Sequence, residues 1–262
     1  MASAPAQQLP LFYKDLTPLN SRDHGAWRMR GVEKASWLVG QHAVPLTVEE
    51  FAQAQRQYPI IFSMGNDPVP LALMGLNEGV NTYVDDDGTI LDNAYLPAYV
   101  RRYPFLLAKL APNADELSLC FDPGSDIIGE FNDGEELFEK DQPSQRTQDM
   151  LKFCQRFEEA GARTSAFVKE LQEHKLLMDG EVAIRRPENG DKPFIYRGFQ
   201  MIDEQKLRKV RGDQLRKWNE SGALALIYAH LFSLDLLRTV FGRQIAQGKG
   251  PALEKAKAAT KK

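Results

Sequence analysis

The residue types best suited to binding or catalysis gather between positions 81 and 102. The candidate ligand-binding residues of this stretch are Asn81, Asp85, Asp87, Tyr95, Tyr99, Arg101 and Arg102. If a helix begins near Leu96, helical spacing puts Tyr95, Tyr99 and Arg102 on one face and directs Arg101 elsewhere. Tyrosine hydroxyls beside a planar guanidinium can bind a carboxylate or a phosphate through paired hydrogen bonds. This stretch is therefore the candidate ligand site.

The two adjacent arginines also have a structural interpretation, which we favour. Guanidinium groups are costly to bury unless each has an anionic partner. We therefore predict that Arg101 or Arg102 forms a buried or half-buried pair with an internal carboxylate, and that the other arginine is more exposed. Asp85, Asp87 and Asp122 are the candidate carboxylates.

The run of aspartates before Gly88 resembles the start of a calcium-binding loop. An EF-hand loop needs a glutamate at its twelfth position, and counting from Asp85 this chain has Leu96 there. Aspartate side chains also bond to the backbone of tight turns, and glycine adopts positive φ in them. We therefore predict a turn at Asp85–Gly88.

Motifs of catalysis and metal binding give no further site. Neither GxGxxG, GxxxxGK[ST], GxSxG nor HExxH occurs, and the four histidines lack metal-binding spacing. His230, Ser233 and Asp235 suggest a catalytic triad, but residues five apart on a helix point in different directions, so we expect a core pair of His230 and Ser233. The catalytic residues are thus unknown, and we expect no metal and no cofactor.

The densest basic cluster lies between positions 206 and 217. Its members are Lys206, Arg208, Lys209, Arg211, Arg216 and Lys217, followed by Trp218. Nucleic-acid binding needs such charge beside aromatic residues. However, the chain as a whole is acidic, and cations near helix ends are favoured by the helix dipole. We do not expect a nucleic-acid partner.

Both strands and helices are predicted to position these residues. Strands are predicted at 33–39, 60–64, 69–76, 80–84 and 116–122, and helices at 47–58, 145–177 and 223–237. A further helix is predicted to start near Leu96 and to end or kink before Pro104, with a continuation through Leu110 left open. The turn-rich PENGDKP predicts a hairpin of 181–186 with 194–202. The fold class is therefore α+β: a single mixed domain with a strand-rich N-terminal half and a helical C-terminal half containing one β-hairpin.

The composition is that of a globular protein. The chain has 262 residues, of which 43% are hydrophobic, and a net charge of −3. We expect one domain over 1–248 and a mobile basic tail over 249–262. No secretory signal is visible, and the apolar stretch 222–232 is about half of the ~20 residues of a membrane span, so we expect a cytoplasmic protein without a membrane span. Two free thiols are the simplest interpretation of Cys120 and Cys154, with a single disulfide as the alternative.

Several long stretches identify a family resemblance. They are VPLTVEEFAQAQRQYPIIFS, LMGLNEGVNTYVDDDGTILDNAYLPAYVRRYPF, GEELF, FQMIDEQKL and ESGALALIYAHLFSL. On these the chain, over about residues 9 to 240, resembles the bacterial SapC family, which is named for its association with surface-layer gene clusters. Members of that family often accompany flavin-dependent halogenase-like proteins, cupin-like oxygenases and TonB-dependent receptors.

The resemblance implies an accessory or binding protein that works with an uptake system or a peptide- or glycan-modifying system. Its partner would be a protein or a small-molecule ligand, and the oligomeric state is open. Two alternatives remain. One is an enzyme acting on a small carbohydrate- or peptide-derived substrate around Asp85, Asp87, Tyr95 and Arg101. The other is a component of the surface layer, against which the missing export signal counts.

Overall fold

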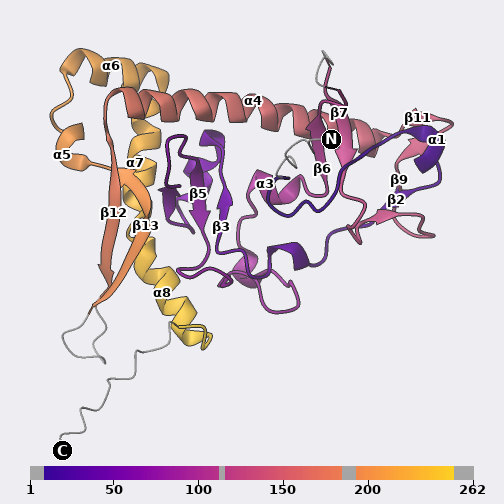
Figure 1. Ribbon diagram of the computed structural model, residues 1–262, viewed down its shortest axis with the longest axis horizontal. Coiled ribbons are helices and arrows are strands. Elements are labelled where there is room, and N and C mark those ends of the chain that lie inside the picture. Colours follow the sequence, from indigo (N-terminus) through magenta and orange to yellow (C-terminus); the bar gives the residue numbers. More distant parts are fainter. Residues whose placement is uncertain (1–8, 112–115, 185–192, 251–262) are drawn as a thin grey trace, which may run out of the picture.

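The computed structural model describes residues 9–111, 116–184 and 193–250 (Figure 1). Its helices are α1 (Ser21–His24), α2 (Phe51–Ala54), α3 (Ala98–Arg101), α4 (Gln145–Glu173), α5 (Glu204–Leu207), α6 (Gly212–Ser221), α7 (Ala223–Ser233) and α8 (Leu236–Ala246). Its strands are β1 (Thr17–Pro18), β2 (Arg28–Met29), β3 (Ala43–Pro45), β4 (Ile60–Phe62), β5 (Pro70–Leu73), β6 (Phe105–Ala108), β7 (Ser118–Phe121), β8 (Ile128–Gly129), β9 (Glu135–Glu136), β10 (Phe138–Glu139), β11 (Gln142–Pro143), β12 (Leu177–Ile184) and β13 (Phe194–Ile202). The predicted α+β class and single domain are confirmed.

The main sheet has the strand order β12-β13-β4-β5-β3, and its neighbours pair antiparallel. α7 packs against β4 and β13. The β4 segment Ile-Ile-Phe is buried at every position, as its continuous apolar run predicts. The larger hydrophobic core lies between this sheet and the helices.

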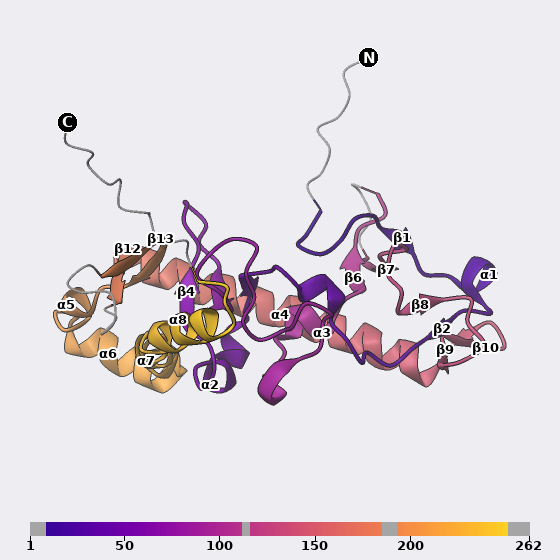
Figure 2. The same cartoon turned by 90° about the horizontal axis from the view of Figure 1, so that it is seen from below.

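Helix α4 joins the two halves of the molecule (Figure 2). Its 29 residues span about 43 Å, and the Ser144 side chain caps its first turn by accepting from the N–H of Thr147. Phe167 and Leu171, near its end, belong to the larger core. Met150 and Cys154, near its start, belong to a second core, beneath the sheets β1-β7-β6 and β8-β2-β9.

The hairpin of β12 and β13 confirms the predicted pairing of the two segments. Glu181 faces Arg197 and Ile184 faces Phe194, and the ladder extends back to Leu177. A bulge interrupts the register beside Gly180. A Cβ on Gly180 would lie 2.2 Å from the ring of Phe199, so only glycine fits there. The last two residues of the predicted first strand, 185 and 186, lie outside the described residues.

Three predicted elements between residues 33 and 110 differ from the structure. The segment 33–39 is not a strand but contains a 3-10 turn, Ser36–Leu38, and 80–84 contributes only a single bridge between Val84 and Ile90. The helix predicted from Leu96 spans Ala98–Arg101 and ends before Pro104 as expected, but it does not resume, and β6 follows. The cause is tertiary: Phe105–Ala108 pairs with β7 and is buried on a sheet, which overrides its helical pattern.

The predicted apolar helix 223–237 is two helices, α7 and α8, and it is not buried all round. The stretch Ala223–Ala246 is long and apolar enough by composition to cross a membrane, with a mean hydropathy of 1.5, and 39% of its most apolar 18-residue segment is buried inside the structure. The helices of a protein core pass the same test. Two residues of α7, His230 and Ser233, bond to the backbone of the main sheet, as core residues do.

The expected basic tail begins with a residue that is bound to the rest of the fold. The N–H of Lys249 donates to the carbonyl of Gln244, and its ammonium lies 3.1 Å from a carboxylate oxygen of Asp86. Residues 251–262 of that tail lie outside the described residues.

Candidate functional site

The turn at Asp85–Gly88 is held by its own bonds. The Asp85 carboxylate accepts from the N–H of Thr89 at 2.7 Å, and Asp87 forms an ion pair with Lys34. A hydrogen bond with the Asp85 carboxyl, and then those from Lys34 and Thr89, lowers the pKa of Asp87. Gly88 has a φ of +91°, and a Cβ there would lie 2.8 Å from the backbone of Ser36. The turn therefore fixes one loop against another.

Asn81 is buried, and its side-chain amide is fully used by the chain itself. Its nitrogen donates to the carbonyls of Leu38 and Gln41 at 3.1 and 3.0 Å. Its oxygen accepts from the N–H of Tyr83 at 2.8 Å. This amide joins the 38–41 loop to the segment that follows Asn81, and no free donor is left to bind a ligand.

Tyr95 is likewise bonded at every polar atom. Its hydroxyl donates to Glu50 at 2.9 Å, its N–H donates to the side chain of Gln57, and its carbonyl accepts from the hydroxyl of Tyr58. Burial, and then the negative charge of Glu50, raises the pKa of Tyr95 to about 12. A raised pKa is the opposite of what a catalytic base at neutral pH requires.

The sequence around Glu50 accounts for only some of the hydrogen bonds that its carboxylate accepts. Thr47 and Glu50 form a capping box, in which the Glu50 carboxylate accepts from the N–H of Thr47 at 3.0 Å. Its other oxygen accepts from the N–H of Ala98 at 2.6 Å as well as from Tyr95. This buried carboxylate therefore has a donor for each oxygen and anchors the start of α3.

The predicted grouping of Tyr95 with Arg102 is wrong. Tyr95 precedes α3, which starts only at Ala98, so helical spacing does not apply to it. Tyr95 instead lies beside Arg101, with the guanidinium 3.5 Å from the hydroxyl. Arg101 is exposed and donates from Nε to the carbonyl of Leu96.

Arg102 is the buried arginine, and its pairing with a carboxylate is confirmed. Its side chain is 7% exposed, and its guanidinium lies 3.5 Å from Glu158 on α4. The guanidinium carbon lies 4.6 Å from the ring centre of Tyr99 and 4.3 Å from that of Phe157. Rings around a cation stabilise it electrostatically. The pair ties α3 to α4 through the second core.

The three carboxylates proposed as partners for the arginines are bonded elsewhere. Asp122 accepts from the backbone N–H groups of Lys14 and Gly124, at 2.8 and 2.9 Å. Asp85 and Asp87 belong to their own turn. Within the part of the chain that the structure describes, no hydrogen bond or ion pair joins that turn to Tyr95, Tyr99 or either arginine. The seven candidate residues thus fall into separate groups: Asn81, the turn of Asp85 and Asp87, Tyr95 with Arg101, and Tyr99 with Arg102.

His230 and Ser233 form the expected core pair, although they do not bond ring to hydroxyl. Nε2 of His230 accepts from the N–H of Ile202 at 3.1 Å, and Nδ1 donates to the carbonyl of Ile60 at 2.7 Å. The Ser233 hydroxyl accepts from the N–H of Ile60 at 2.8 Å. Both side chains therefore bind α7 to the sheet. Burial lowers the pKa of His230 to about 4.

Nucleophiles and metal ligands are not assembled in the described residues. Cys120 and Cys154 are free and buried, and burial raises the pKa of Cys154 to about 12, so its thiol is not poised for attack. Among residues 9–111, 116–184 and 193–250, no group of three or more histidine, cysteine, aspartate or glutamate side chains could hold a metal ion.

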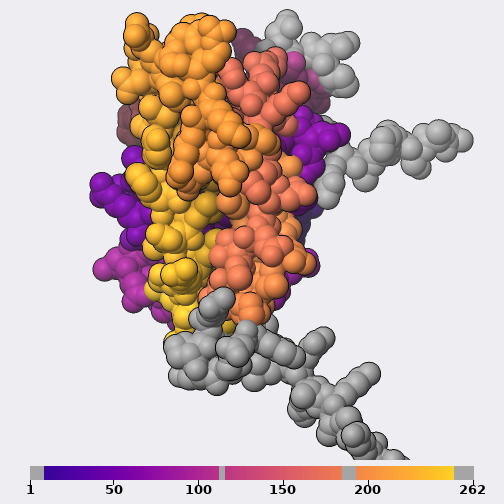
Figure 3. All heavy atoms as spheres, turned by 90° about the vertical axis from the view of Figure 1, so that its left-hand side faces the viewer, coloured from indigo at the N-terminus to yellow at the C-terminus, as the bar shows by residue number. Residues whose placement is uncertain are grey.

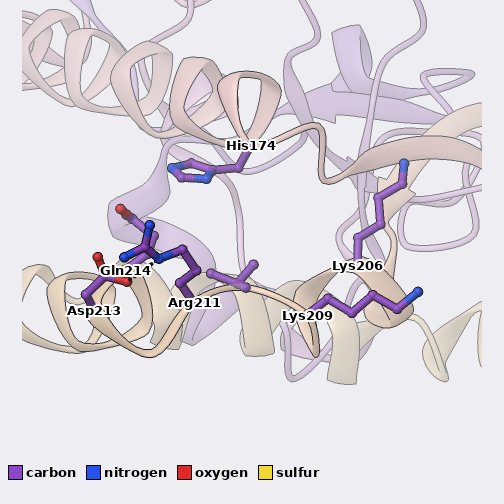
Figure 4. Close-up of a pocket in the computed structure, with 7 residues that line it drawn as sticks. His174, Lys206, Lys209, Arg211, Asp213 and Gln214 are labelled. Atoms are coloured by element: carbon purple, nitrogen blue, oxygen red, sulfur yellow. Dashed lines mark ion pairs between the residues drawn. The ribbon is translucent and has the colours of Figure 1, made fainter.

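One hollow lies at the helical end of the molecule, where α4 ends and α6 begins (Figure 4). Its volume is about 420 Å³. The residues that line it are His174, Lys206, Lys209, Val210, Arg211, Asp213 and Gln214. The basic cluster of the sequence thus contributes three cations to this hollow, whereas no residue of the predicted ligand site lines it.

Comparison with known proteins identifies the family of this chain but no individual relative. No curated protein and no solved structure matches the chain. The model of one family, SapC, matches residues 19–240. The match includes most of both cores, the main sheet and α4 to α7. On this evidence the chain belongs to the SapC family.

Proposed function

We propose that this protein is an accessory binding protein, which docks onto another protein of an uptake system or a peptide- or glycan-modifying system. The observation that carries the proposal is an aromatic pair on the outer face of α7. Phe232 is 68% exposed and Tyr228 is 43% exposed, and their rings stack at 5.7 Å. Exposed aromatic residues that lie together are typical of protein interfaces.

The rest of that helix supports docking on this side. Ile227, His230 and Ser233 face the core, so α7 is fixed rigidly from behind. The half-buried Leu224 lies one turn before Tyr228 and extends the apolar surface. Figure 3 shows that α5 to α8 and the β12–β13 hairpin together cover this end of the molecule.

The charge beside α7 indicates what kind of partner fits. α6 packs on α7, and its exposed Arg216 and Lys217 have no ion pair among the described residues. The complementary surface is therefore an apolar groove with carboxylates at its rim, since opposite charges favour encounter and orientation. Buried free cysteines agree with a reducing compartment, and we propose the cytoplasm.

The enzyme alternative has less support. Asp85 and Asp87 share one turn and Tyr95 lies beside Arg101, but among the described residues no hydrogen bond or ion pair joins the first pair to the second. The raised pKa of Tyr95 makes its hydroxyl a poor base at neutral pH. A binding protein needs no such arrangement.

The test is direct binding to the enzymes that accompany this family, the halogenase-like and the cupin-like proteins, measured by calorimetry with the full chain. We expect one of them to bind, and Phe232→Ser to weaken that binding at least about tenfold. The control is Leu117→Ser, because Leu117 is also exposed, at 45%, but lies at the opposite end of α4, beside β7. Equal affinity of Phe232→Ser and the unchanged protein, or no binding to either enzyme, would contradict the proposal.

A further inference from the structure

The hollow between α4 and α6 has an excess of positive charge that the protein itself does not neutralise. Lys206, Lys209 and Arg211 line it, against the single carboxylate of Asp213. That carboxylate already pairs with Arg211 at 3.2 Å, and Lys206 lies 3.6 Å from Asp203 at the start of α5. Lys209 has no ion pair within the described ranges. A net charge of the hollow above zero, with one cation unpaired, favours an anionic ligand.

The backbone adds donors on the same side. α6 has ten residues, and Asp213 and Gln214 of its first turn line the hollow. No side chain caps this helix, and the N–H groups of Gly212, Asp213 and Gln214 donate to no group of the described residues. Free N–H groups at a helix start, together with the helix dipole, bind phosphate well.

The walls of the hollow are held in place from behind. Glu170 of α4 accepts from Trp218 at 2.6 Å and from the side-chain amide of Gln214 at 3.1 Å. The ring of His174 meets that of Trp218 edge-on at 5.0 Å, and Trp218 is buried. In Figure 4 the His174 ring lies on the α4 side, opposite the first turn of α6, with Lys206 and Lys209 at the other end. The side of the hollow formed by His174 and Gln214 is therefore ordered before a ligand enters.

We propose that this hollow binds the phosphoryl group of a small soluble ligand. Three cations and the backbone N–H groups of Asp213 and Gln214 suit the several oxygens of a phosphate dianion better than a planar carboxylate. The site is separate from the docking face proposed above, since neither Tyr228 nor Phe232 lines the hollow.

The test measures binding of inorganic pyrophosphate, the probe, to the full chain by calorimetry at low salt. We expect saturable binding with one site, about tenfold weaker in Lys209→Gln and restored by Lys209→Arg. Lys209 has no structural partner, so these variants should fold; thermal melts check this. The matched control is Lys217→Gln, which removes an exposed cation from the same helical region outside the hollow, and should bind as the unchanged protein does.

Two further binding measurements distinguish a soluble phosphate from a lipid headgroup, and a phosphate from a carboxylate. Vesicles of phosphatidylcholine containing phosphatidic acid should not retain the protein, and citrate should bind at least about tenfold more weakly than pyrophosphate. Vesicle binding without pyrophosphate binding, equal binding of citrate, or equal losses in Lys209→Gln and Lys217→Gln would overturn the proposal. Phe232→Ser should leave pyrophosphate binding unchanged, so failure here is distinguishable from failure of the docking proposal.

Discussion

Lowering the pH should destabilise this protein through one buried imidazole, that of His230. Because its Nε2 accepts a hydrogen bond from the N–H of Ile202, the ring must stay neutral to hold α7 on the sheet. Its other nitrogen already donates to the carbonyl of Ile60. Burial lowers the pKa from 6.5 to about 4 in the folded protein. The unfolded chain therefore takes up a proton first as the pH falls.

The sign and size of the effect follow from that difference in pKa. The stabilisation is complete above the unfolded pKa of 6.5 and is lost as the pH falls toward about 4. The whole difference corresponds to about 3 kcal/mol in the free energy of unfolding. Between pH values of about 7.5 and 5.5, where few carboxylates titrate, the loss should be about 1.3 kcal/mol.

The assay is urea unfolding followed by tryptophan fluorescence at several pH values in this window. His230→Gln is the comparison, because an amide can also accept from Ile202 and donate to Ile60 but does not titrate. The difference in unfolding free energy between the two proteins should shrink by about 1.3 kcal/mol from the upper to the lower pH. Subtracting the variant removes the contribution of the other histidines. Parallel curves for the two proteins would refute the reasoning.

Two substitution experiments test the remaining contacts. Glu50→Gln keeps the shape of the side chain but replaces one acceptor oxygen by an NH2 group, which must then face an N–H or hydroxyl donor. We therefore expect the free energy of unfolding in urea melts to fall by roughly 2–3 kcal/mol. A fall below about 0.5 kcal/mol would contradict this. Arg102→Ala should cost roughly 2–3 kcal/mol, since it removes a buried guanidinium packed between rings while Glu158 can still reach water. Arg101→Ala should cost under about 1 kcal/mol, and equal losses in both variants would show that the assignment of the buried arginine is wrong.

Local signals in the sequence predict the elements whose causes are themselves local. α4 is predicted by its periodic apolar residues, and the β12–β13 pairing by the turn residues between its strands. Gly161 does not break α4, because its position faces open space and needs no special conformation. The segment Phe105–Ala108 is predicted incorrectly, because its state depends on β7, which follows only at Ser118.

Contacts between distant segments explain what the sequence leaves hidden at the candidate site. The pairing of Arg102 with Glu158 spans 56 positions, and that of Glu50 with Tyr95 spans 45. No local pattern encodes either pair. The exposure of Phe232 is hidden for a related reason: an apolar composition predicts burial all round, whereas the sheet covers only one side of α7.

The stretch 81–102 resembles a functional site because it must connect many parts of the fold. The carbonyl of Thr82 alone accepts from the side chains of Arg243 and Gln247 on and just after α8. Asn81 and Tyr95 also form hydrogen bonds with other segments, so their polar atoms are already bonded within the protein. Groups available to another molecule are those left without such partners, and among the described residues these include Lys209, the first turn of α6 and the rings of α7. We therefore expect binding of other molecules at the helical end of the molecule and not at the stretch 81–102, whose residue types are those of a ligand site.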